Sequence, residues 1–173
     1  MPDLRDALFA DLDHELDATR QILAAVPWDR ADWKPHDKSM PLGRLATHVA
    51  TLPRFGTTAL TTDGMDLAEL RPPQDEVGSV DALLAVWDRE SAALRDTLAG
   101  ADDDGLGQEW SMTMNGHPVA SGARHAVVRQ WTLSHIAHHR GQLTVYLRLL
   151  DVPFPGVYGP SADDKARMAS RQG

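Results

Sequence analysis

Residues 124–150 read RHAVVRQWTLSHIAHHRGQLTVYLRLL, and this stretch decides the fold. It contains no proline, and its apolar residues recur every three or four positions, as in an α-helix that buries one face. A helix of this length extends about 40 Å at 1.5 Å per residue. The predicted buried face carries Val128, Trp131, His135, His139, Gln142, Tyr146 and Leu149. Two histidines therefore interrupt a face that otherwise has the composition of a core.

Three earlier segments show the same period, and they predict helices over residues 3–26, 42–61 and 80–98. Ser39 and Ser79 are predicted to cap the second and third of these helices, because a serine hydroxyl accepts hydrogen bonds from first-turn N–H groups. The pair Asn115-Gly116 lies between two short alternating segments and predicts a type I′ β-hairpin before the last helix. The tail after residue 150 is rich in proline and glycine and is expected to hold one short terminal helix.

These elements predict an all-α fold. Four amphipathic helices with long connections are typical of a four-helix bundle, here a single domain over residues 1–173 with a short hairpin before the last long helix. Such bundles place metal and ligand sites in the interior, on side chains of facing helices.

The composition excludes several classes of function. The chain has 173 residues, with 17 Lys and Arg against 25 Asp and Glu, and its net charge is −8. An acidic chain without a basic face is not expected to bind nucleic acid or anionic membranes. No cysteine is present, so thiolate metal sites, disulfides and cysteine nucleophiles are excluded. No segment has the roughly 20 apolar residues of a membrane span or the pattern of a signal peptide, and a cytoplasmic location is expected.

Three histidines form the strongest candidate site. His135 and His139 are four residues apart, so their imidazoles lie on one helical face and can bind a single ion. His48 lies on the apolar face of the 42–61 helix, together with Leu45 and Leu52, and can supply a third nitrogen ligand. A single histidine on such a face is commonly a hydrogen-bonded core residue, but two on one inward face are costly to desolvate unless both find partners. His138 is expected beside this site rather than in it.

Two sequence blocks, DWKPHDKSMPLGRLATHVATLPRF and SHIAHHRGQLTVYLRLLDVPFPGVYG, resemble the DinB/YfiT-like family of four-helix-bundle proteins. The first family motif is matched by Trp33, Lys34, Pro35, Ser39, Gly43, Leu45 and His48. The second is matched by His135, His139, Arg140, Gly141 and Gln142. The blocks cover about a third of the chain, and residues 61–122 carry little that is recognisable.

The resemblance implies a metal site on His48, His135 and His139, with nickel or zinc as the ion, and a homodimer. Some relatives are metal-dependent hydrolases or transferases that use a low-molecular-weight thiol, so a small-molecule substrate is expected in a pocket of the bundle core. The alternative is a non-catalytic metal-binding or stress-response protein, and a third reading is a metal-free scaffold. No carboxylate is tied to the histidines by a motif, so the sequence assigns no general base.

Neighbouring residues have structural interpretations. Arg140 is expected to form an ion pair, and Gln142 to face the interior near the site. Gly141, in the middle of a helix, is expected where another segment approaches closely. Asp11 and Glu15 lie on the polar or boundary part of the first predicted helix and could reach the metal site, although solvated carboxylates are commoner at such positions. Exposed positions are expected for His14, His36, His117 and His125.

Overall fold

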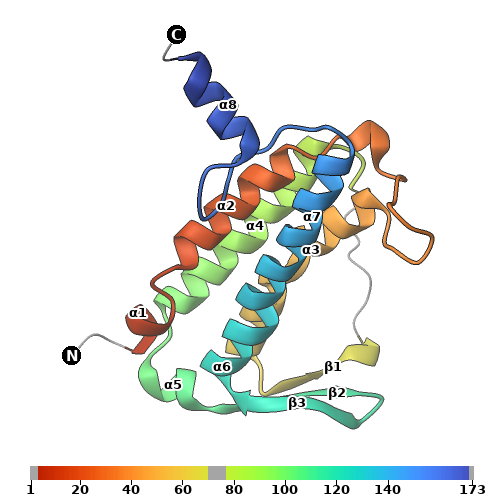
Figure 1. The fold of residues 1–173 in the computed structure, drawn as a ribbon. Coiled ribbons are helices and arrows are strands. Elements are labelled where there is room, and N and C mark those ends of the chain that lie inside the picture. The colour runs from red at the N-terminus through yellow and green to blue at the C-terminus, as the bar shows by residue number, and fades with distance from the viewer. Residues whose placement is uncertain (1–3, 70–76, 172–173) are drawn as a thin grey trace.

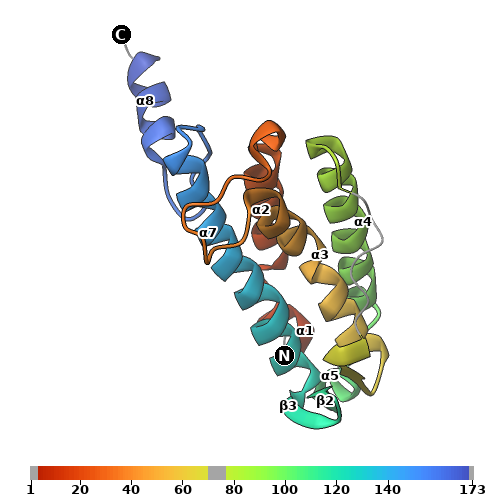
Figure 2. The same cartoon turned by 90° about the vertical axis from the view of Figure 1, so that its right-hand side faces the viewer.

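The computed structural model describes residues 4–69 and 77–171. Its helices are α1 (Leu4–Leu8), α2 (Leu12–Ala24), α3 (Leu42–Thr61), α4 (Val80–Ala99), α5 (Asp103–Gly107), α6 (Arg124–Val128), α7 (His135–Leu149) and α8 (Ala162–Ser170). α3 packs against α4 and α7, and α2 packs against the same two helices, so these four long helices enclose most of the core (Figure 1, Figure 2). The long helices predicted from the periodicity are present, although residue 3 lies outside the described ranges.

The core consists of two clusters that follow one another along the helices. One joins α2, α3, α4 and α7 through residues such as Leu16, Leu45 and Ile136. The other lies toward the sheet and includes Leu94, Trp110 and Val128. None of the helices in these two ranges combines the length and the apolar character that a membrane span requires.

The predicted cap of α3 is wrong. The helix begins at Leu42, directly after Pro41, and no side chain caps it. Its first-turn N–H groups are instead bound by the preceding loop: the Leu42 N–H donates to the carbonyl of Trp33 and the Gly43 N–H to the carbonyl of Ala31, each at 2.8 Å. Because backbone carbonyls already accept these hydrogen bonds, Ser39 has no capping role. The cap of α4 is confirmed, since the Ser79 hydroxyl accepts from the Ala82 N–H at 3.1 Å.

Two irregularities interrupt the predicted helices, and they face each other. The first helix breaks between α1 and α2, at residues 9–11, and the last contains a π-helical segment, Arg129–Ser134, between α6 and α7. Arg129 donates to the carbonyl of Leu8 at 3.0 Å and forms an ion pair with Asp11 at 2.6 Å. One arginine in the π segment therefore holds the break in the opposite helix.

A three-stranded sheet corrects the all-α prediction. It contains β1 (Gly64–Asp66), β2 (Glu109–Met114) and β3 (His117–Ala123) in that order, and it lies at the end of the molecule opposite α8 (Figure 1). β2 and β3 form the predicted hairpin, in which Asn115 and Gly116 both have positive φ, as a type I′ turn requires. β1 pairs with β2 in parallel, and a Cβ at Gly64 would lie 2.8 Å from the Ser111 carbonyl oxygen. The fold is thus mostly helical with a small mixed sheet.

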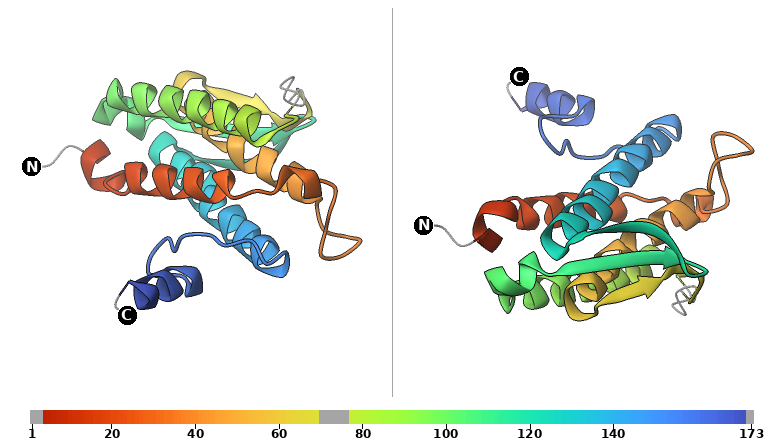
Figure 3. Two further views of the ribbon diagram at one scale, coloured as in Figure 1. Left: turned by 90° about the horizontal axis from the view of Figure 1, so that it is seen from above. Right: turned by 90° about the horizontal axis from the view of Figure 1, so that it is seen from below.

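The short terminal helix is confirmed as α8, which stands apart from the other helices (Figure 3). Ser161 and Asp164 form a capping box at its start. The segment between α7 and α8 turns back along α2, and this return brings Tyr158 to Glu15.

Candidate metal centre

Three imidazoles from two helices meet between α3 and α7. His48 comes from the second turn of α3, and His135 and His139 come from the start of α7. The Nε2 atoms of His135 and His139 are 2.8 Å apart, and those of His48 and His135 are 3.5 Å apart. One ligand atom from each of the three residues lies within 4.8 Å of the other two. The structure therefore brings together the three histidines that the sequence selects.

Two of the rings are fixed by hydrogen bonds on the side away from the cluster. His139 Nδ1 lies 2.7 Å from Oε1 of Gln142, and since this oxygen only accepts, Nδ1 carries the proton. His135 hydrogen-bonds to the backbone of Trp131, four residues earlier. Because its Nε2 faces the other histidines, we assign this bond to Nδ1–H and the Trp131 carbonyl. In the neutral rings, both Nε2 lone pairs then point toward the same place.

Burial opposes protonation of the cluster. Desolvation is the main cause that lowers the pKa of His48 to about 4, and the charges of His139, His135 and Arg44 add to it. Desolvation likewise lowers the pKa of His135 and of His139, against the hydrogen bonds that raise it. Near neutral pH the site thus consists of neutral imidazoles, the form that binds metals.

The nitrogen separations fit a shared ion. Zinc–imidazole bonds are about 2.0–2.1 Å long, so two nitrogens on one ion are separated by about 2.8–3.0 Å at octahedral angles and by about 3.3–3.4 Å at tetrahedral angles. The observed 2.8 and 3.5 Å lie close to these intervals. Imidazole ligands suit zinc, nickel, copper and iron. Among the residues that the structure describes, this cluster contains no carboxylate.

A pocket opens beside His48. It has a volume of about 790 Å³ and is lined by residues of the 28–32 turn, of α3 and by Val77. Pockets of this size bind small molecules. It lies over the start of α3. The substrate pocket predicted from the sequence lies instead inside the bundle core.

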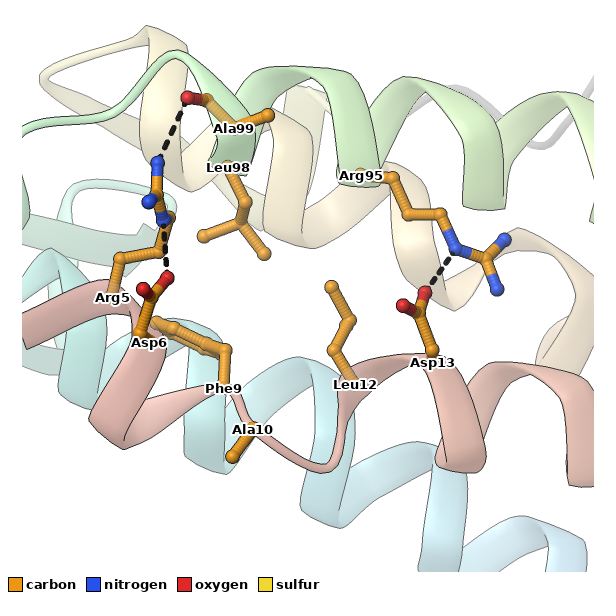
Figure 4. Close-up of a pocket in the computed structure, with 9 residues that line it drawn as sticks. All are labelled: Arg5, Asp6, Phe9, Ala10, Leu12, Asp13, Arg95, Leu98 and Ala99. Carbon is orange, nitrogen blue, oxygen red and sulfur yellow. Dashed lines mark hydrogen bonds and ion pairs between the residues drawn. The ribbon is translucent and has the colours of Figure 1, made fainter. Parts of the chain in front are cut away.

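A second pocket, of about 550 Å³, lies between the α1–α2 break and the end of α4 (Figure 4). It contains no histidine, and its charged side chains pair with one another or with neighbours: Arg5 with Asp6 at 3.0 Å and Arg95 with Asp13 at 2.6 Å. The pocket beside His48 is therefore the better candidate for binding a small molecule near the histidine cluster.

The two carboxylates considered for the site bind arginines instead. Arg140, with 2% of its surface exposed, forms an ion pair with Glu15 at 2.7 Å and donates to Thr19 at 2.9 Å. The Tyr158 hydroxyl contacts both Arg140 and Glu15, and burial, followed by its bond to Glu15, raises its pKa. Asp11 pairs with Arg129. The ion pair expected for Arg140 is thus present.

Other predicted roles have mixed outcomes. His138 lies beside the site, with its Nε2 3.1 Å from the Gln142 amide nitrogen. The close approach predicted at Gly141 is wrong, because a Cβ there would meet no atom within 4 Å. His14, His36 and His117 are exposed, whereas His125 is half-buried. The side chain of Trp131 packs against the core cluster near the sheet.

Sequence reasoning missed the carbonyl of Trp131 and the π segment that precedes His135. Backbone acceptors leave no mark in side-chain identity. One signal for the π segment was available. Val128, Thr132 and Ile136 are all buried and follow one another at intervals of four residues, which is longer than the α-helical period of about 3.6.

Comparisons with known proteins agree with this architecture. A model of the DinB family matches residues 1–172. A Bacillus subtilis (strain 168) protein named "Uncharacterized protein YrdA" is 27% identical over 170 residues, which cover 93% of this chain and 96% of that protein. The crystal structure of the DinB-like protein YjoA from Bacillus subtilis has a TM-score of 0.64 and 18% identity, covering 86% of this chain and 96% of YjoA.

A second crystal structure, of a DinB-like protein from Bacillus cereus ATCC 10987, has a TM-score of 0.66 and 20% identity. It covers 88% of this chain and 97% of the Bacillus cereus protein. These two likenesses show a shared fold. With the family match over almost the whole sequence, the chain belongs to the DinB family.

Proposed function

We propose that the protein binds one divalent metal ion through His48, His135 and His139 and uses it to act on a small molecule. The observation that carries this proposal is the pair of Nε2 atoms 2.8 Å apart, on rings whose Nδ1 protons point away to Gln142 and Trp131. Two lone pairs at this distance repel each other unless a cation or a proton lies between them. The lowered pKa values disfavour the proton, so a metal ion is the better occupant.

A catalytic role is supported by the number of ligands and by the pocket. Three protein nitrogens leave at least one position free on a tetrahedral ion, whereas structural sites use four protein ligands. Of the three histidines, His48 lines the pocket, so a substrate bound there would lie beside this ligand. When bound, the ion would act as a Lewis acid, which suits a hydrolase or a transferase that uses a low-molecular-weight thiol.

The residues of the chain have separate tasks in this proposal. His48, His135 and His139 hold the ion, while Gln142 and the Trp131 carbonyl keep the two α7 rings in the tautomer that binds metal. The 28–32 turn and the outer face of α3 form the walls against which the substrate lies. Nickel or zinc as the ion, a homodimer and a cytoplasmic location stay predictions from the sequence.

Metal content of the untagged protein tests the proposal, because a polyhistidine tag would bind the ions that are counted. We expect about one nickel or zinc ion per chain after reconstitution, and loss of most of it in His48→Ala, His135→Ala and His139→Ala. His36→Ala and His117→Ala are matched controls, since both side chains are exposed and lie outside the cluster. Stoichiometric metal in His135→Ala would refute the ligand set.

Catalysis needs its own experiment. The zinc- and nickel-loaded proteins would be screened for ester and amide hydrolysis and for thiol transfer, with the triple histidine variant as the blank. Turnover that requires the three histidines supports an enzyme. Metal binding without turnover of any class would favour the alternative, a non-catalytic metal-binding protein.

A further inference from the structure

The pocket beside His48 has walls fixed by backbone contacts. The N–H groups of Leu42 and Gly43 donate to the carbonyls of Trp33 and Ala31, which ties the 28–33 turn to the first turn of α3. A Cβ at Gly43 would lie 2.9 Å from the Cβ of Ala31, so glycine permits this close approach. The pocket is therefore formed before any ligand binds, which lowers the entropic cost of binding.

One face of α3 lines this pocket with Arg44, Thr47, His48 and Thr51. The two threonine hydroxyls donate to helix carbonyls, Thr47 to Gly43 at 2.8 Å and Thr51 to His48 at 3.0 Å. Their protons are thus engaged within the helix. Of these four side chains, Arg44 carries the positive charge, and it forms part of the pocket wall.

Arg44 is exposed, and within residues 4–69 and 77–171 no carboxylate lies at ion-pair distance from it. Arg54, which lies further along α3, differs in this respect, because it forms an ion pair with Glu90 at 2.7 Å. Asp32 also lines the pocket, but it forms no ion pair with Arg44 in the described structure. Among the residues that the structure describes, no carboxylate thus engages the bidentate donor set of the guanidinium, and this set can bind an anion.

Arg44 lies one helical turn before His48, and residues four apart on a helix are neighbours on its surface. A group bound at Arg44 would therefore lie next to the histidine cluster.

We propose that this pocket binds the anionic group, such as a carboxylate, of the small molecule on which the metal centre acts, and that Arg44 holds it. The proposal rests on the proposed function of the three histidines and adds the charge class of the substrate. It makes Arg44 a specificity-determining residue that selects acids over neutral analogues.

Two thiols of nearly equal size test this selection. 3-Mercaptopropionate carries a carboxylate where 3-mercapto-1-propanol carries a hydroxymethyl group, and each would be titrated calorimetrically into the zinc-loaded protein at low ionic strength. We expect the acid to bind about tenfold more tightly, because hydrogen bonds to a charged group are the stronger ones. Added salt should reduce the difference.

Substitutions assign the effect to one side chain. Arg44→Gln should remove the preference for the acid, and Arg44→Lys should keep part of it. Arg171→Gln is the matched control, because Arg171 is exposed at the end of α8 and is not among the residues that line the pocket, and it should keep the full preference. Zinc content and thermal unfolding of each variant show that the centre and the fold are intact.

The outcomes separate the two proposals. A zinc-loaded protein that binds both thiols equally, or an Arg44→Gln variant that keeps the preference, overturns the anion site and leaves the metal centre standing. A chain that takes up neither zinc nor nickel overturns the metal centre, and it also overturns the anion site, which rests on that centre.

Discussion

His139 and Arg140 are consecutive residues of α7, and they serve two regions of opposite character. His139 faces α3 and joins a cluster of nitrogen atoms whose lone pairs point at one another. Arg140 faces α2, where Glu15 and Thr19 accept from its guanidinium, and Tyr158 of the segment after α7 also contacts it. Both regions consist of polar groups: His139, Arg140, Glu15 and Thr19 are buried, whereas His48 and His135 are half-buried.

The difference lies in whether the chain satisfies its own polar groups. The Arg140 region pairs opposite charges and its donors meet acceptors, so it needs no further component. The histidine cluster brings like groups together and fixes the rings so that the lone pairs face one another. Buried polar groups of the first kind stabilise a fold, whereas those of the second kind are typical of a site that awaits a ligand.

The largest expected effect comes from breaking the satisfied region. Arg140→Ala leaves the Glu15 carboxylate buried without its partner and should lower the free energy of unfolding by about 3–5 kcal/mol. Urea unfolding monitored by circular dichroism measures this loss. The control is Arg148→Ala on the same helix, where Arg148 is 45% exposed and pairs with Asp163, and it should cost at most about 1 kcal/mol. Equal losses of unfolding free energy in the two variants would contradict the idea that the buried Arg140 pair matters more to stability than the exposed Arg148 pair.

An intermediate effect is expected from pH, and it belongs to the histidine cluster. The pKa of His48 is lowered from 6.5 to about 4, so between these values the unfolded chain binds a proton that the folded chain does not. The stability of the metal-free protein should therefore be greatest above pH 6.5 and should fall by about 2 kcal/mol between pH 7.5 and pH 5.

Urea unfolding with a chelator present, at pH 7.5, 6 and 5, measures this slope. His48→Gln should flatten it, whereas His36→Gln, at an exposed position, should keep the wild-type profile. A stability that rises as the pH falls through this interval would contradict the assignment of a neutral cluster.

The smallest effect is expected at Gln142, which is not one of the three proposed ligands but hydrogen-bonds to His139. Gln142→Leu removes the acceptor of His139 Nδ1–H and should weaken zinc binding about tenfold. Gln142→Glu, which keeps an acceptor, should retain most of the affinity. Zinc affinity is measured by competition with a chromophoric chelator, and ¹⁵N chemical shifts of His139 report its tautomer.

Gln130→Leu is the matched control, because Gln130 is exposed on the π segment. If Gln142→Leu binds zinc as tightly as this control, the amide does not orient the ligand.

Patterns within one element made much of the fold predictable. The periodicity of residues 42–61 and 80–98 locates α3 and α4, Ser79 marks the start of α4, and Asn115-Gly116 marks the hairpin. Contacts between distant elements were not predictable in this way. β1 has three residues, and its pairing with β2 depends on the close contact of Gly64 with Ser111, which no local pattern records.

The same division applies to the candidate site. The three histidines could be selected because spacing places each of them on an inward face, and the metal ligand set itself stays a prediction. The partners of Arg140 could not be named, since they come from α2 and from the return of the chain after α7. Ser39 was misassigned because the carbonyls that replace a cap belong to Trp33 and Ala31, which lie nine and twelve positions before the N–H groups that they bind.

The π segment before His135 has a consequence for comparing relatives. A π turn contains one residue more than an α-helical turn. The buried positions of α7 are therefore shifted by one residue from those that a continuous helix starting at α6 would have. An alignment anchored on the histidines and one anchored on Val127 and Val128 will disagree by one residue across 129–134. A relative that has a continuous α-helix here should therefore show a one-residue gap in this interval, with both of its flanking motifs intact.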